Sequence, residues 1–185
     1  MITKTAVSVE ELIDRLYRTE GKAEIINGEV VEMTATGFLP GRASGRIFRS
    51  LDDYEQQNDG GYAIPDNVGF LVNLPNRNSF SPDAAFYVGP STGGKFINGA
   101  PAFAAEVRSE WDYGKRAERK IAEKIADYFA AGAIVVWDVD VLREEVVRVH
   151  RRDDPNNPVI YHRGEIADAE PAVPGWGFPV DEMFR

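Results

Sequence analysis

Cysteine is absent from this 185-residue sequence. Disulfide bonds, thiolate catalysis, cysteine-ligated zinc and iron–sulfur clusters are therefore excluded. Only two histidines are present, which disfavours a zinc site built from histidine. No apolar run approaches the length of about 18 residues that a transmembrane helix needs, and the first residues lack the apolar segment of a signal peptide. We therefore expect a cytoplasmic protein that does not enter a membrane.

Positive charge is scarce, with 21 Lys and Arg against 30 Asp and Glu and a net charge of −9. An acidic chain is a poor candidate for binding nucleic acid through its overall charge alone, although a local basic groove beside an acidic metal site is compatible with this balance. The remaining composition, 43% hydrophobic and 11% aromatic, is typical of a globular protein. The length predicts one domain over residues 1–185.

Local signals predict both helices and strands. Ser8 and Glu11 form a capping-box pattern before a helical stripe that ends ahead of Gly21. Asn27 and Gly28 lie between two β-forming runs within 23–33, the strongest short-range hairpin signal. A second helix is expected over about 41–57, and the most regular one over 115–131. Strands are expected within 62–74, 80–88, 102–107, 133–139, 145–151 and 159–162, and ordered loops within 89–101 and 173–180.

Carboxylates on the predicted strands are the main candidates for chemistry. Asp83 follows Pro82 at a strand start, and Glu106 interrupts an otherwise apolar strand. A carboxylate in a buried strand is costly unless it is paired, hydrogen-bonded or bound to a metal. Two or three converging carboxylates suit Mg²⁺ or Mn²⁺, and Glu24 in the hairpin is a candidate for the third. Alternatively, Asp83 caps a turn and Glu106 pairs with a basic residue.

Basic residues lie near these carboxylates in the sequence. Arg108 stands two residues after Glu106, on the same face of the strand. A stripe of basic residues at four-residue spacing follows on the next helix, where a cation can stabilise charge that develops on a phosphate; a solvated helix face is the alternative. The stripe consists of Arg116, Lys120 and Lys124. The helix over 41–57 carries three arginines along one face, which we consider a candidate surface for the nucleic-acid backbone: Arg42, Arg46 and Arg49.

Several of these segments resemble the Uma-type restriction endonucleases, a family within the PD-(D/E)XK nuclease superfamily. The superfamily signature is similar to Pro82 and Asp83 followed by residues 106–108 (Glu-Val-Arg). The family hairpin resembles residues 24–33 (Glu-Ile-Ile-Asn-Gly-Glu-Val-Val-Glu-Met). Its later segments resemble residues 106–109 with Asp112, residues 124–132 with Trp137 and Asp138, and residues 173–180 with Met183 and Phe184. The likeness spans nearly the whole chain in one order.

The resemblance implies an α/β (α+β) fold with a mixed central β-sheet flanked by helices, preceded by an N-terminal helix and a β-hairpin. It also implies Mg²⁺-dependent cleavage of DNA phosphodiester bonds and permits a homodimer. Asp83 and Glu106 would be metal ligands, Glu24 an accessory acid that also approaches the metal, and Lys124 the catalytic cation supplied by a helix. Arg108 stands where the superfamily motif carries lysine, so it is the second candidate for that cation; it cannot act as a neutral base.

Two functions follow as hypotheses. The first is a DNA endonuclease that uses Mg²⁺ or Mn²⁺ held by carboxylates and an activated water. The second is a nuclease-like fold that binds nucleic acid or protein without cleaving it. Metal-dependent DNA cleavage that is lost with Asp83→Ala would distinguish the two.

Overall fold

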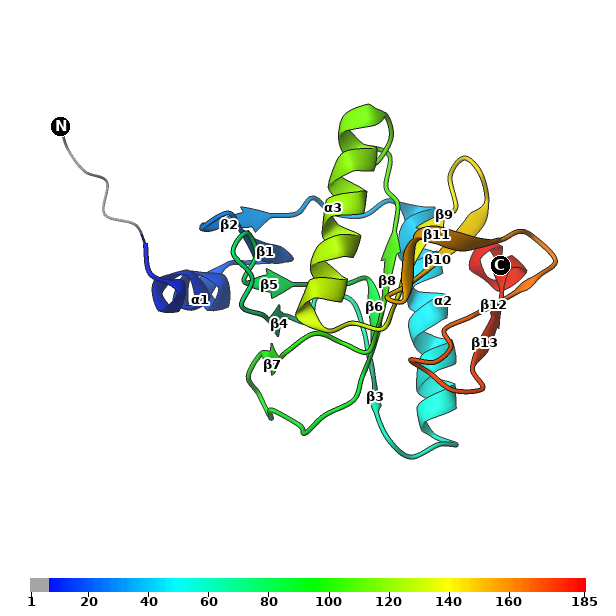
Figure 1. Cartoon of the computed structure of the whole chain (residues 1–185), viewed down its shortest axis with the longest axis horizontal. Helices are drawn as coiled ribbons and strands as arrows, with labels where there is room; N and C mark the ends of the chain where they lie inside the picture. The colour runs from blue at the N-terminus through cyan, green and yellow to red at the C-terminus, as the bar shows by residue number, and fades with distance from the viewer. Residues whose placement is uncertain (1–6) are drawn as a thin grey trace.

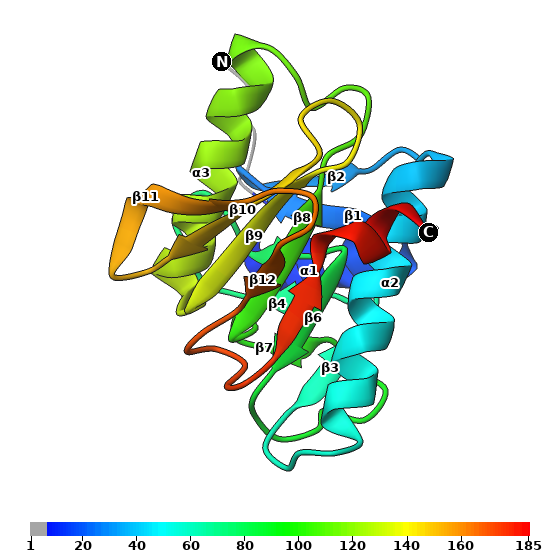
Figure 2. The ribbon, with the colours of Figure 1, turned by 90° about the vertical axis from the view of Figure 1, so that its right-hand side faces the viewer.

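The computed structural model describes residues 7–185 and has a six-stranded sheet. Figure 2 shows this sheet between two long helices. The helix α2 (Phe38–Glu55) covers one face of the sheet, and α3 (Lys115–Ala131) covers the other. Strands β8 and β9 are parallel, and the other neighbours in the sheet are antiparallel. The strand order is β11 (Asp154–Tyr161), β10 (Val146–Arg151), β9 (Val135–Asp140), β8 (Phe103–Val107), β6 (Ala84–Tyr87) and β3 (Tyr62–Ile64). This mixed sheet flanked by helices confirms the predicted fold class.

Smaller elements extend the molecule on the side of the N-terminus (Figure 1). They are α1 (Val9–Arg18), the hairpin β1 (Ala23–Ile26) and β2 (Glu29–Glu32), and a three-stranded sheet of β4 (Phe70–Leu71), β5 (Ser79–Phe80) and β7 (Ile97–Asn98). The predicted capping box is present, because Ser8 and Glu11 exchange side-chain and backbone hydrogen bonds. Asn27 and Gly28 have φ of 51° and 73°, the positive values that a type I′ hairpin turn requires.

The two long helices agree with their sequence signals to different degrees. The bounds of α3 are those predicted, and Gly132 ends the helix in the left-handed conformation with φ of 111°. Helix α2 begins at Phe38, three residues earlier than expected, because Pro40 lies in the first turn, where a missing N–H costs nothing. Within the described residues, no helix is long and apolar enough to cross a membrane.

Strand β8 divides its side chains between the two layers of the core. Phe103, Ala105 and Val107 pack on the α2 side with Trp137, whereas Ala104 packs on the α3 side with Tyr128. Side chains alternate along a strand, so Glu106 lies on the α3 side. The sheet register thereby sets which helix can contact this carboxylate.

The C-terminal segment is more regular than the sequence predicted. Two short strands, β12 (Ile166–Asp168) and β13 (Gly177–Pro179), pair before a 3₁₀ helix, η1 (Val180–Phe184). Trp176 and Phe178 are buried, as expected from their size. Strand β7 also interrupts the predicted loop over 89–101. These strands are only two or three residues long, so the hydrophobic periodicity of the sequence could not reveal them.

Candidate active site

Asp83 and Glu106 lie beside each other on adjacent antiparallel strands. Asp83 immediately precedes β6, which pairs with β8 in the register Ala84 to Ala105. The backbone N–H of Asp83 donates to the carbonyl of Ala105 (3.0 Å), and its Oδ2 accepts the N–H of Val107 (2.7 Å). Asp83 therefore contacts the residues on both sides of Glu106. The structure brings together the two carboxylates that the sequence singled out.

Lys124 reaches this pair from α3. Its Nζ lies 2.8 Å from Oε2 of Glu106 and 2.9 Å from Oε1 of Glu24. One turn later on the same helix face, the hydroxyl of Tyr128 donates to Oε1 of Glu106 (2.6 Å). Both oxygens of Glu106 are therefore held by side chains of α3. The alternative that Glu106 pairs with a basic residue also holds, and the partner is Lys124.

Lys22 is a second cation of the site that the sequence analysis missed. Its Nζ lies 2.5 Å from Oδ1 of Asp83 and 2.7 Å from Oδ1 of Asp66. Lys22 stands two residues before Glu24 at the start of the hairpin, and side chains two residues apart on a strand point the same way. That spacing was the available signal. Asp83 is thus paired with Lys22, and Glu106 with Lys124, which also contacts Glu24.

Glu24 is fully buried and already satisfied. Arg77 forms an ion pair with its Oε2, and the N–H of Ser81 donates to its Oε1 (3.0 Å) beside the contact with Lys124. Arg77 is held in turn by Asp127 on α3 through a 2.9 Å contact from Nε. Glu24 therefore links the hairpin to α3. The cations in contact with Glu24 are the side chains of Lys124 and Arg77.

The charges of the cluster shift the pKa values of its members. Burial raises the pKa of Glu106, and the charges of Asp83 and Glu24 raise it further against the opposing effect of Lys124. Burial lowers the pKa of Lys124, but the charges of Glu106 and Glu24 outweigh it, and the net direction is upward. Burial raises the pKa of Tyr128 well above its ordinary value. Lys124 is therefore an ammonium ion and Tyr128 a neutral phenol at neutral pH.

The geometry allows a divalent cation with two protein ligands. Within residues 7–185, no group of three carboxylate or histidine side chains is arranged to hold a metal. Mg²⁺ requires only one or two protein carboxylates when water and phosphate complete its shell. Asp83 and Glu106 offer the hard oxygen ligands that Mg²⁺ and Mn²⁺ prefer. The residues present fit such an ion, provided that it competes with Lys22 and Lys124.

An open pocket gives access to Asp83. It has a volume of about 240 Å³ and lies between this residue and α2, where Gly41, Ser44 and Gly45 form part of its wall. The hydroxyl of Ser44 donates to the backbone carbonyl of Asp83 (2.7 Å), so the helix and the strand start are joined there. The small residues on this helix face leave room next to the carboxylate.

Arg108 shares the sheet face of Glu106 but does not pair with it. Nε and Nη2 of Arg108 each lie 2.7 Å from the carboxylate of Asp138, and Nη1 lies 2.6 Å from Glu118. Only 6% of its side chain is exposed. Arg108 is therefore not the basic partner of Glu106, because its donors are taken by Asp138 on β9 and by Glu118 on α3.

The three arginines on α2 differ in their surroundings. Arg42 and Arg46 both donate to the backbone carbonyl of Arg185, and Arg46 also lies 3.8 Å from Glu182. These two side chains therefore contact the C-terminal segment, whereas Arg49 is exposed.

On the stripe of α3, Arg116 and Lys120 are exposed and Lys124 alone reaches the carboxylates.

Comparison with known proteins shows a matching family model and a likeness to a solved structure. A family model, Uma2, described as "Putative restriction endonuclease", matches residues 9–181. A crystal structure from Anabaena variabilis ATCC 29413, described as that of "a putative nuclease belonging to DUF820", has a TM-score of 0.72 and 14% sequence identity, and the match covers 94% of this chain and 97% of that chain. No curated protein matches the chain. At this identity the structural likeness concerns the fold.

Proposed function

The chain belongs to the Uma2 family, described as "Putative restriction endonuclease", and on that premise we propose that it hydrolyses DNA phosphodiester bonds with a divalent cation held by Asp83 and Glu106. The family and the fold of its structural neighbour support a nuclease. The metal, the substrate and the roles of the residues are our inference from the site.

The observation that carries the proposal is the convergence of two carboxylates and a lysine where β6 begins and β8 ends. Asp83 accepts the N–H of the residue that follows Glu106 (2.7 Å), and Lys124 lies 2.8 Å from Glu106. A buried carboxylate is costly when it is unpaired. Here the chain places two partly buried carboxylates together and supplies both with cations, an arrangement that suits the binding of a metal and a phosphate.

Each residue has a role that follows from its contacts. A bound Mg²⁺ would polarise the phosphate and lower the pKa of a water molecule. Lys124, which is protonated, stabilises negative charge that develops on the phosphate; it does not act as a general base. Tyr128 orients Glu106 by donating to its Oε1, and Glu24 orients Lys124. We assign Glu24 this positioning role and leave the metal to the other two carboxylates.

The two remaining groups of candidates act differently. Arg108 is held by Asp138 and Glu118, so we assign it to the wall of the site and give the role of catalytic cation to Lys124. Contact of Arg42 and Arg46 with the C-terminal segment reduces their freedom to bind a DNA backbone. Arg49 keeps the role expected for the arginine face.

Cleavage of plasmid and single-stranded DNA in Mg²⁺ or Mn²⁺ tests the proposal. We expect activity that EDTA abolishes and that Asp83→Asn or Glu106→Gln reduces at least about a hundredfold, because the metal loses a ligand. Asp168→Asn is the matched control, since this carboxylate pairs with Arg151 elsewhere (2.6 Å). Full activity of Asp83→Asn, or activity that persists in EDTA, would contradict the proposal.

A binding module without catalysis is the second candidate, and one observation favours it. Lys22 and Lys124 neutralise Asp83 and Glu106 within the chain itself, so the cluster is balanced without a metal. Wild-type protein that binds DNA in Mg²⁺ and Mn²⁺ yet leaves it intact would support this candidate over the nuclease.

A further inference from the structure

The N-terminus of α3 and the turn between β9 and β10 lie toward the upper edge of the molecule in Figure 1. Charged side chains from both segments form a second cluster. An open pocket of about 850 Å³ occurs there. Four of its lining side chains are basic and two are acidic: Arg108, Lys115, Arg119 and Arg143, with Glu118 and Glu144. None of the roles proposed above accounts for this concentration of positive charge in an acidic protein.

Two buried carboxylates fix the walls of the pocket. Asp140, which is 1% exposed, accepts the hydroxyl of Tyr113 (2.8 Å) and the backbone N–H of Arg143 (2.9 Å). The guanidinium carbon of Arg143 lies 3.8 Å from the centre of the Tyr113 ring. Asp138 holds Arg108 through both of its oxygens. The pocket is therefore built from buried contacts that orient its polar groups before a ligand arrives.

The positive charge of the pocket is not compensated within it. Glu118 pairs with Arg108 (2.6 Å) and Glu144 with Arg148 (2.7 Å), so both lining carboxylates have partners. Lys115, Arg119 and Arg143 form no ion pair within residues 7–185 and are exposed to solvent. Three cations facing one pocket repel one another unless an anion joins them.

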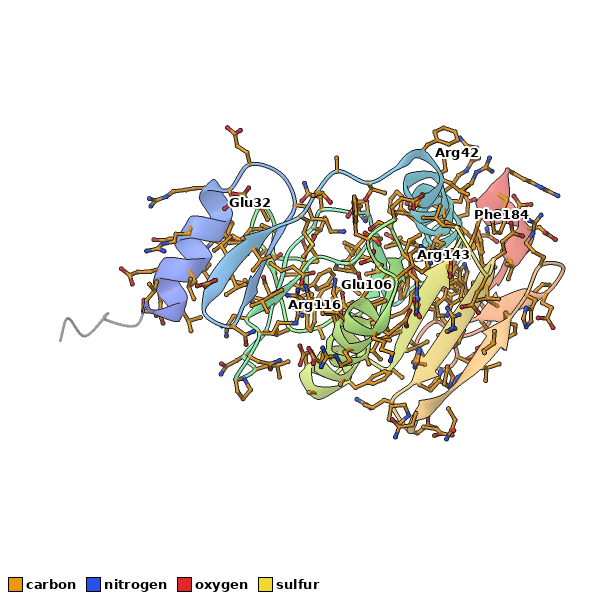
Figure 3. The ribbon with its side chains drawn as sticks, turned by 90° about the horizontal axis from the view of Figure 1, so that it is seen from above. Glu32, Arg42, Glu106, Arg116, Arg143 and Phe184 are labelled. Carbon is orange, nitrogen blue, oxygen red and sulfur yellow. The ribbon has the colours of Figure 1, made fainter. Side chains whose placement is uncertain are left out.

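The pocket lies beyond Glu106 along the same strand and the same helix. Two contacts connect β8 and its extension to α3: Glu106 with Lys124, and Arg108 with Glu118. An extended chain advances about 3.3 Å per residue, so Arg108 lies at most about 6.6 Å beyond Glu106. Figure 3 looks down on this edge and labels Glu106, Arg116 and Arg143 around α3. A nucleic-acid strand carries one phosphate per nucleotide along its backbone, so a phosphate beside Arg108 would lie within about two nucleotides of one at Glu106.

We propose that this pocket binds a backbone phosphate of the nucleic-acid strand, within about two nucleotides of the phosphodiester that lies at Asp83 and Glu106. The identification of the ligand as a nucleic-acid strand rests on the proposed function. The pocket and its positive charge do not depend on that proposal. Arg119, Lys115 and Arg143 contact the phosphate, and Arg108 and Tyr113 form the fixed wall behind them. Their uncompensated charge supplies the local attraction that the net charge of −9 denies to the molecule as a whole.

Binding of a short fluorescein-labelled DNA duplex, and of the same strand alone, tests the inference by anisotropy in EDTA. EDTA removes divalent metal and the measurement follows binding alone, so it is independent of the proposed chemistry. We expect Arg119→Gln and Arg143→Gln each to weaken binding about tenfold and to reduce the slope of log affinity against log salt by about 1. Arg152→Gln, which removes the same charge near Gly132 at the opposite end of α3, is the matched control and should bind as wild type does.

The outcomes separate this inference from the nuclease proposal. Binding that depends on Arg119 and Arg143, but not on Arg152, supports the pocket even if wild type cleaves nothing. Equal affinity and equal salt slope in Arg119→Gln, Arg143→Gln and wild type would overturn it, even if cleavage requires Asp83. A similar loss in the Arg152 control would also overturn it, since overall charge would then explain the effect. Unchanged melting temperatures exclude misfolding.

Discussion

Lys124 on α3 forms an ion pair with Glu106 on β8, with 2.8 Å between Nζ and Oε2, although the two residues are 18 positions apart. The helix face that carries Lys124 also carries Tyr128, which donates to the other oxygen of Glu106. The orientation of the carboxylate is therefore set by the packing of α3 against the sheet. We therefore expect changes at this contact to affect both the stability of the fold and the proposed cleavage.

Lys124→Met should lower both stability and cleavage. Lys124 compensates Glu24 and Glu106, and removing one partner of a buried ion pair costs about 3 kcal/mol. We expect a lower urea midpoint and a cleavage rate at least about a hundredfold below wild type. Lys120→Met, the same substitution one turn earlier on an exposed position, should change neither. A wild-type rate in folded Lys124→Met would remove Lys124 from the mechanism.

Arg108→Met should act mainly on stability. The guanidinium is 6% exposed and holds both oxygens of Asp138, so its loss leaves a buried carboxylate poorly compensated, at a cost of about 3 kcal/mol. We expect kcat at saturating substrate to fall less than about tenfold, because Lys124 still contacts Glu106. Urea unfolding and steady-state rates measure both quantities. A kcat that collapses while the urea midpoint holds would make Arg108 the catalytic cation.

Gly45 tests whether the pocket next to Asp83 admits substrate. A Cβ added at this position meets no heavy atom within 4 Å. Gly45→Ala should therefore raise the unfolding free energy by about 0.5–1 kcal/mol, because alanine favours the helix, and should leave cleavage unchanged. Gly45→Leu should reach into the pocket of about 240 Å³ and raise KM for DNA. Equal KM values for the two variants would show that substrate approaches by another route.

Glu24 gives the cluster a defined dependence on pH. Burial raises its pKa, but the charges of Lys124 and Arg77 outweigh this effect and hold the pKa below the usual 4.5. A carboxyl with a lowered pKa in the folded state stabilises the fold above its unfolded pKa and loses that contribution as the pH falls through the folded value. The stability difference between wild type and Glu24→Gln should therefore be largest at neutral pH and shrink below about pH 4.5. Urea midpoints across this range measure it, and a difference that grows on acidification would contradict the assignment.

Local patterns in the sequence predicted much of the fold. The capping box at Ser8, the hairpin at Asn27 and Gly28, and the whole of α3 follow from signals within a few residues of each element. The two-residue strands, such as β7, do not, because pairing with distant strands defines them. The mixed sheet was expected from a family resemblance, since strand order depends on contacts far apart in the chain.

The sequence predicted the candidate site only in part, because some of its contacts join residues far apart in the chain. Asp83 and Glu106 could be singled out because a carboxylate in an apolar strand is unusual, and their strands are neighbours. The basic residues that pair with these two carboxylates could not be assigned from the sequence. The spacing placed Arg108 near Glu106, but Arg108 pairs with Asp138 on β9. Glu106 pairs instead with Lys124 on α3. Lys22 escaped notice because its partners, Asp66 and Asp83, lie 44 and 61 positions away.

Binding of Mn²⁺ to the purified protein, followed by electron paramagnetic resonance of the free ion, tests most directly whether Asp83 and Glu106 form a metal site. The measurement needs no substrate and no turnover. We predict saturable binding to wild type and to Asp168→Asn, competition by Mg²⁺, and loss of that binding in both Asp83→Asn and Glu106→Gln. Saturable binding that survives both substitutions, or a wild-type protein that binds no Mn²⁺ even with DNA present, would contradict the account.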